Sequence, residues 1–96
     1  MLQIVLSGPQ SQRKNVLKAL VGAGFQVVID EHGEPLTHSW GMAQNHETVV
    51  VDGVPVSKSD PRVPVSFITV LGVDADRAAQ FVDPLKWRLR AHAEVN

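Results

Sequence analysis

The sequence predicts a small α/β domain with a mixed or mostly parallel central sheet, a β-α-β start and C-terminal helices. We expect a sheet of roughly four to five strands, as is usual for a domain of this size. Three observations support this prediction. Residues 2–30 read as a strand, a helix and a second strand, residues 65–73 form the longest apolar run, and a helical pattern follows that run. A chain of 96 residues is a single domain, 1–96.

The opening unit shows both strand and helix periodicity. Alternate residues of 2–6 fall on one face of a strand, and Ser7-Gly8-Pro9 is expected to end it. Either Ser7 or Ser11 is a candidate cap for the following helix, whose apolar stripe is Val16, Leu17, Leu20 and Val21. Residues 25–30 alternate again and predict the second strand. So short a unit favours a right-handed crossover onto the sheet.

The segment from residue 48 to 56 has the pattern of a β-hairpin. Asp52-Gly53 stands between valines, and both residues tolerate the positive φ angles of a tight hairpin turn. Pro55 has no backbone N–H, so the second arm is expected to be an edge strand. Residues 57–64 then form a loop before the apolar run.

The apolar run of residues 65–73 has large apolar side chains on both faces, as a central strand covered on both sides requires. Asp74 is the expected cap of a short helix, Ala75–Val82. Asp83-Pro84 then kinks or restarts the chain, and a last helix is predicted over residues 85–93.

An internal echo suggests a second arrangement. Residues 4–20 and residues 68–85 share a strand, a glycine and the start of a helix. Because a duplicated strand-helix unit is the plan of ferredoxin-like domains, a ferredoxin-like α+β sandwich is the alternative fold.

Composition excludes several classes of protein. Apolar residues make up 44% and charged residues 20% of the chain, as in ordinary globular domains. The formal net charge of −1 argues against a strongly basic nucleic-acid binder. The absence of cysteine removes disulfides and thiolate chemistry. No apolar run is long enough to span a membrane, and no signal-peptide pattern opens the chain, so we expect a soluble cytoplasmic protein.

Residues 8–15, GPQSQRKN, occupy the place of a phosphate loop between a strand and a helix. They resemble a Walker A motif, but Arg13 replaces its second glycine and Asn15 replaces the hydroxyl that binds magnesium. A solvated helix start with a basic first turn is the simpler interpretation. A third interpretation, intermediate between a nucleotide-binding loop and a solvated helix start, is a site for an isolated anion at the helix N-terminus. Its candidate residues are Ser7, Gly8, Arg13 and Lys14.

Residues 31–47 are polar, without a clear period, and predict a long loop. His32, His38 and His46 lie in this loop among carboxylates, a ligand type that suits zinc or nickel. Their irregular spacing favours a solvated loop, and we predict neither a metal site nor a cofactor. No serine or threonine is visibly paired with a histidine base, so we predict no catalytic residue and a non-enzymatic protein.

The tail carries cations on either side of a tryptophan. Trp87, Arg88 and Arg90 are a candidate partner interface. Basic residues around an aromatic ring also suit nucleic acid. The tail is short of cations for such a ligand, so we favour a protein partner over nucleic acid.

Several stretches resemble a BRCT domain. Residues 5–28 match its opening strand, hydroxyl-glycine pair, helix and second strand. HETVVVDG resembles its third strand, and VDPLKWRLRAH resembles its closing tryptophan-bearing helix. The resemblance implies a phosphate-binding pair at Ser7 and Gly8 and a structural role for Trp87. The family's lysine has no secure counterpart, Lys58 being a candidate, and the long loop and the additional helix depart from the pattern.

The sequence therefore predicts a non-enzymatic module for protein interaction or for binding an anionic or phosphorylated ligand. One alternative is a degenerate P-loop-type nucleotide binder. Another is a structural homodimer with Phe67, Trp87 or the strand beside Pro55 at its interface.

Overall fold

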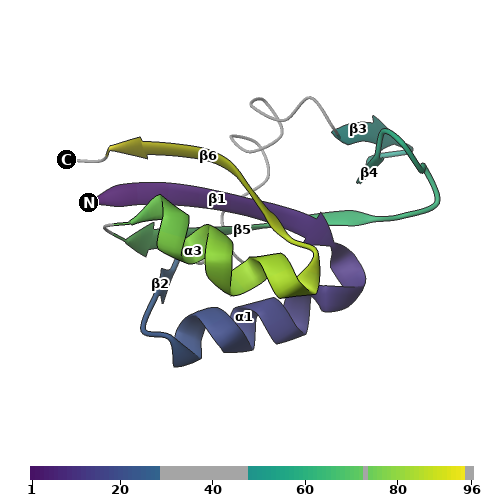
Figure 1. Ribbon diagram of the computed structural model, residues 1–96. Helices are drawn as coiled ribbons and strands as arrows, with labels where there is room; N and C mark the ends of the chain where they lie inside the picture. The colour runs from purple at the N-terminus through teal and green to yellow at the C-terminus, as the bar shows by residue number, and fades with distance from the viewer. Residues whose placement is uncertain (29–47, 73, 95–96) are drawn as a thin grey trace.

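The computed structural model describes residues 1–28, 48–72 and 74–94 (Figure 1). Two helices and two single 3-10 turns belong to this part of the chain: η1 (Gln10–Gln12), α1 (Arg13–Gly22), α3 (Ala75–Val82) and η2 (Asp83–Leu85). Its strands are β1 (Leu2–Pro9), β2 (Gln26–Val27), β3 (Thr48–Val51), β4 (Val54–Ser57), β5 (Val65–Gly72) and β6 (Arg88–Glu94).

The main sheet is antiparallel throughout the described residues. Its strand order is β2-β5-β1-β6, and every neighbouring pair runs antiparallel. The prediction of a mixed or mostly parallel sheet with a β-α-β start is therefore wrong. β1 and β2 run in the same direction, but β5 lies between them. A strand-helix-strand pattern in a sequence indicates that the helix packs back on the sheet, but it does not indicate which position the next strand takes.

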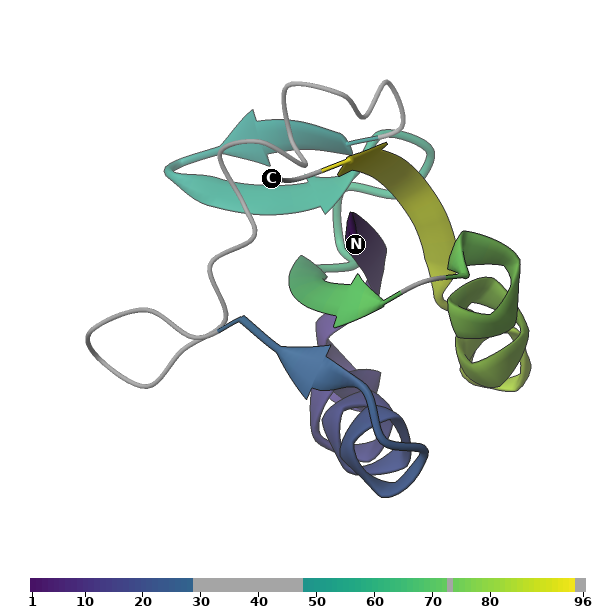
Figure 2. The ribbon, with the colours of Figure 1, turned by 90° about the vertical axis from the view of Figure 1, so that its left-hand side faces the viewer.

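The strands β5 and β6 likewise run in the same direction, and β1 lies between them. The two strand-helix-strand units thus interleave, with the connectivity of a split β-α-β sandwich. Both helices cover one face of the sheet (Figure 1). The hairpin of β3 and β4 is inserted between the two units and lies on the side of the opposite face, as Figure 2 shows.

The core lies between the sheet and the two helices. The side chains of Ile4, Leu6, Ile68 and Val70 point toward the helices, because alternate residues of a strand share one face. Fully buried residues of the helices and of the segment after α3 meet them: Val16, Leu20, Ala78, Val82 and Trp87. On the other face of the sheet Val5, Ser7, Phe67 and Thr69 are also buried, which confirms that β5 is a central strand covered on both sides.

The C-terminal segment is a strand, so the helix predicted over residues 85–93 is wrong. Lys86 has a left-handed backbone with φ of 64° and turns the chain out of η2 into β6. Trp87 and Leu89 face the core while Arg88 and Arg90 do not, which is the alternation of a strand. This segment is short and has few apolar residues, so its sequence fits the periodicity of a helix as well as that of a strand. Its pairing with β1 selects the strand.

The first strand also departs from the prediction. Ser7-Gly8-Pro9 does not end it, since β1 pairs with β5 as far as Pro9 and Val65. No side-chain cap precedes η1 or α1, so neither Ser7 nor Ser11 caps the helix. Proline is tolerated here because the pairing of β1 with β6 ends at Ser7, so that among the described strands only β5 flanks β1 at Pro9. The second strand is shorter than predicted within the described residues, with only Gln26 and Val27 in the sheet.

Two local predictions are confirmed. Asp52 and Gly53 join β3 to β4 with φ angles of 52° and 80°, as the hairpin turn requires. The carboxylate of Asp74 caps α3 by accepting hydrogen bonds from the backbone N–H groups of Asp76 at 3.0 Å and Arg77 at 3.2 Å.

Several expectations fall outside the described residues: the end of the second strand, the loop of residues 31–47, and the histidines His32, His38 and His46. Among the helices that are described, none combines the length and the apolar character needed to span a membrane.

Candidate anion-binding site

The structure places the four residues predicted to bind an anion at the start of α1 in different surroundings. Ser7 is buried, and its hydroxyl accepts a hydrogen bond of 2.6 Å from Nε of Arg90. Arg13 turns toward β5, where its Nη1 donates to the hydroxyl of Ser66 and, at 3.0 Å, to the carbonyl of Phe67. Lys14 is exposed on the first turn of α1.

Gly8, the fourth of these residues, lies against the indole of Trp87. A Cβ at Gly8 would stand 2.5 Å from the Cγ and Cδ1 atoms of Trp87. Glycine is therefore needed at this position for the close approach of a ring to a strand. Trp87 is fully buried, and its Nε1 donates to the carbonyl of Pro9 at 3.2 Å. Because Trp87 has no exposed surface, we favour Arg88 and Arg90 over Trp87 as contacts to a partner.

Cations of the tail instead line a pocket near the hairpin. The pocket has a volume of about 250 Å³ and lies between the end of β1, the start of β6 and the loop after β4. We call it the basic pocket. It is lined by Gly8, Pro9, Thr48, Ser57, Ser59, Val63, Val65, Lys86, Arg88 and Arg90. These include three cations and three hydroxyls, and none of the described lining residues is acidic.

The turn into β6 and a β-bulge place the three cations. Lys86 occupies the left-handed position that starts the turn, and Arg88 is the first residue of β6, in register with Ser7. The register slips by one residue at Arg90, because Leu6 pairs with Leu89 while Val5 pairs with Ala91. Such a bulge redirects a side chain and bends its strand. Arg90 uses its Nε on Ser7, whereas the exposed side chains of Lys86 and Arg88 have no polar partner in the described part of the chain.

The loop after β4 supplies hydroxyls at the rim of the basic pocket. The hydroxyls of Ser57 and Ser59 lie 2.9 Å apart. In the same loop the carboxylate of Asp60 accepts hydrogen bonds from the side chain of Arg62, at 3.0 and 3.3 Å, and from its backbone N–H. These bonds from Arg62 hold the pKa of Asp60 below its usual value. The carboxylate of Asp60 is thus paired with Arg62 of the same loop.

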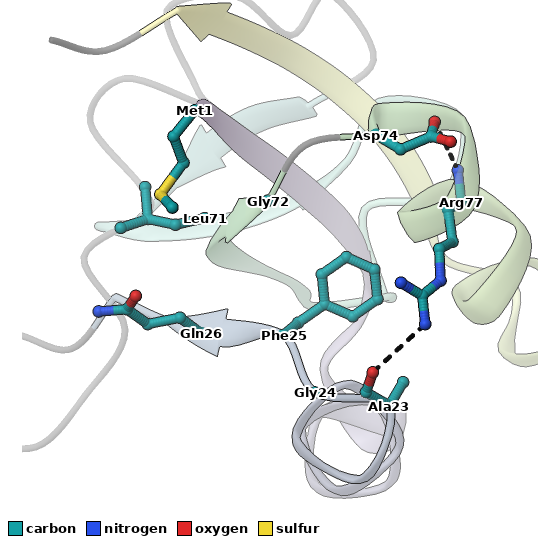
Figure 3. A pocket seen from close by; sticks show the side chains of 9 residues that line it. All are labelled: Met1, Ala23, Gly24, Phe25, Gln26, Leu71, Gly72, Asp74 and Arg77. Atoms are coloured by element: carbon teal, nitrogen blue, oxygen red, sulfur yellow. Dashed lines mark hydrogen bonds between the residues drawn. The ribbon is translucent and has the colours of Figure 1, made fainter.

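A second pocket, also of about 250 Å³, lies between the end of α1 and the start of α3 (Figure 3). Its two charged side chains have structural roles. Asp74 caps α3, and Arg77 donates to the carbonyl of Ala23 at 3.4 Å (Figure 3). The guanidinium of Arg77 also lies over the rings of Phe25 and Phe81, at 5.3 and 5.6 Å from their centroids. We therefore favour the basic pocket as the functional site.

The sequence indicated part of the basic pocket. Arg88 and Arg90 were predicted as interface residues, and Gly8 as an anion-binding residue. Lys86 belongs to the same basic stretch of the tail but was not among the predicted interface residues, and the hydroxyls of Thr48, Ser57 and Ser59 were missed. The alternation of cations with Trp87 and Leu89 is the signal that could have revealed a strand with one basic face. The hydroxyls carry no such signal, since tertiary packing alone brings the hairpin to this place.

Comparisons of the chain with protein-family models, with curated proteins and with solved structures give no match. The resemblance to BRCT domains thus stays a prediction from the sequence. Among the described residues, no group of three or more histidine, aspartate or glutamate side chains is placed to hold a metal ion.

Proposed function

We propose that this protein is a non-enzymatic interaction module that binds a phosphate-bearing ligand in the basic pocket. The observation that carries the proposal is the composition of the lining: three cations and three hydroxyls without a carboxylate among the described residues. Guanidinium and ammonium groups form charge-assisted hydrogen bonds with phosphate oxygens, and hydroxyls donate further ones. The proposal includes a cytoplasmic location, since a cysteine-free chain suits a reducing compartment.

Lys86 and Arg88 are the residues on which binding should depend most. Both are exposed and have no polar partner in the described residues, so a ligand does not have to displace an existing bond. Hydrogen bonds to charged groups contribute roughly 1.5–3 kcal/mol when shielded from water and less at an exposed site. We therefore expect each cation to change the affinity by about tenfold.

The test is calorimetric titration with inorganic phosphate and with phosphoserine at low salt. The variant Lys86→Gln/Arg88→Gln should lose most of the affinity. The control Lys14→Gln/Lys18→Gln removes the same charge from the exposed face of α1 and should bind normally. If the control loses binding and the first variant keeps it, the anion site lies at α1 and the basic pocket is refuted. Binding of ATP with magnesium but not of phosphoserine would instead support the nucleotide-binding alternative.

Self-association is a second candidate function, and the hairpin favours it. Val49, Val50, Val51 and Val54 are exposed, and they gather on two short strands. Clustered apolar side chains at a surface often mark a protein contact. Sedimentation at increasing protein concentration tests this candidate. A monomer at every concentration would refute it.

A further inference from the structure

We propose that the ligand is an extended phosphopeptide, which adds as a strand to the outer edge of β6 while its phosphate occupies the basic pocket. This inference rests on the proposed function and specifies the partner. Its first support is the position of β6 at the end of the sheet order β2-β5-β1-β6. No strand in the described residues pairs with the outer edge of β6. An edge strand presents backbone N–H and C=O groups that can pair with another chain.

The basic pocket and this edge share the first residue of β6. Arg88 lines the pocket and is also the first residue of β6, and Lys86 precedes it by two residues. The bulge at Arg90 divides the strand into a part at the pocket and a regular part, residues 91–94, that pairs with the start of β1. A peptide that extends from the pocket along β6 therefore passes the bend at this bulge and then lies beside a regular strand edge.

Direction follows from the geometry of antiparallel pairing. β6 runs away from the basic pocket, so an antiparallel partner runs toward it. The phosphorylated residue then lies at the C-terminal end of the bound segment, with the preceding residues beside residues 91–94. At the far end of β6, Oε1 of Glu94 pairs with the N-terminal amine of Met1 at 2.7 Å. The cations that attract an anionic peptide are therefore those near the pocket.

Charge favours this partner over a second copy of the chain. Cations at an edge strand discourage its pairing with the edge of a second sheet. They attract a strand that carries a phosphate. Nucleic acid is less favoured because no aromatic side chain belongs to the described lining of the pocket, and Trp87 is buried, so no base can stack on it.

The test uses an alternating valine-threonine hexapeptide that ends in phosphoserine amide. Two added backbone hydrogen bonds contribute roughly 1–3 kcal/mol, so the peptide should bind about 5- to 150-fold more tightly than phosphoserine amide alone. Two isomeric peptides, N-methylated at one or the other set of alternate residues, are the controls. One of them blocks the amides that face β6 and should lose this gain. The other methylates amides that face away from β6 and should keep it. In amide NMR spectra, the peptide should shift residues 91–94, whereas inorganic phosphate should shift only residues that line the pocket.

The outcomes separate the two proposals. If both methylated peptides bind as tightly as the parent, or if residues 91–94 do not shift, the peptide does not add to β6. The inference then fails while the phosphate site stands. Equal binding by a single-stranded hexathymidylate would overturn the peptide in favour of nucleic acid. If neither phosphate nor phosphopeptide binds, the proposed function itself fails.

Discussion

Replacing Gly8 with alanine should destabilise the fold strongly, because the added Cβ meets a fully buried indole. The Cβ would stand 2.5 Å from Cγ and Cδ1 of Trp87, whereas carbon atoms in contact are about 3.5–4 Å apart. Neither side moves easily, since Gly8 lies in a strand paired with β5 and Trp87 has no exposed surface. Overpacking costs roughly 1–3 kcal/mol. Losing the bond from Trp87 to Pro9 adds about 0.5–1.5 kcal/mol.

Urea denaturation followed by circular dichroism measures this loss. We expect the free energy of unfolding to fall by about 2–4 kcal/mol for Gly8→Ala. Gly22→Ala is the matched control. Nothing lies within 4 Å of a Cβ at Gly22, and this residue belongs to α1, so alanine should stabilise the chain by roughly 0.5–1 kcal/mol. A Gly8→Ala variant that unfolds within about 0.5 kcal/mol of the parent would show that the indole does not pack against β1.

Two further predictions concern a helix cap and a loop. Asp74→Ala removes the acceptor for the backbone N–H groups of Asp76 and Arg77, and should lower the free energy of unfolding by about 1 kcal/mol in the same assay. Asp74→Asn retains an acceptor and should recover most of that loss. Arg62 depresses the pKa of Asp60, so this pair stabilises the fold above the usual pKa of aspartate and loses its effect as the pH falls through the depressed value. Carboxyl NMR titration should show the pKa of Asp60 rise toward 3.8 in Arg62→Ala, and an unchanged value would contradict the side-chain hydrogen bonds of Arg62 as its main cause.

Predictions from the sequence succeeded where a few neighbouring residues decide the structure. Asp52-Gly53 formed its hairpin because both residues take positive φ at low cost, whatever lies around them. Asp74 capped α3 because its partners are two and three residues away. The run in β5 read as a central strand because both of its faces are apolar.

Predictions failed where distant segments compete for the same place. The order β2-β5-β1-β6 depends on β5 taking the position beside β1, and nothing within the opening unit specifies that choice. The tail became a strand because its pairing with β1 outweighs its weak helical pattern. The phosphate site that we propose differs from the predicted anion site for the same reason. Arg13 was drawn to Ser66 and Phe67, while Arg88 came to the pocket with β6.

The sequence by itself determined the positions of the two described helices, the hairpin and the central strand, since these depend on local backbone preferences and on which faces are apolar. Only the tertiary structure decided the sheet order, the burial of Trp87 against Gly8 and the meeting of Lys86 and Arg88 with the hydroxyls after β4. The physical reason is that these features join residues far apart in the chain, where the packing of the whole core selects one arrangement among several that suit each segment equally well.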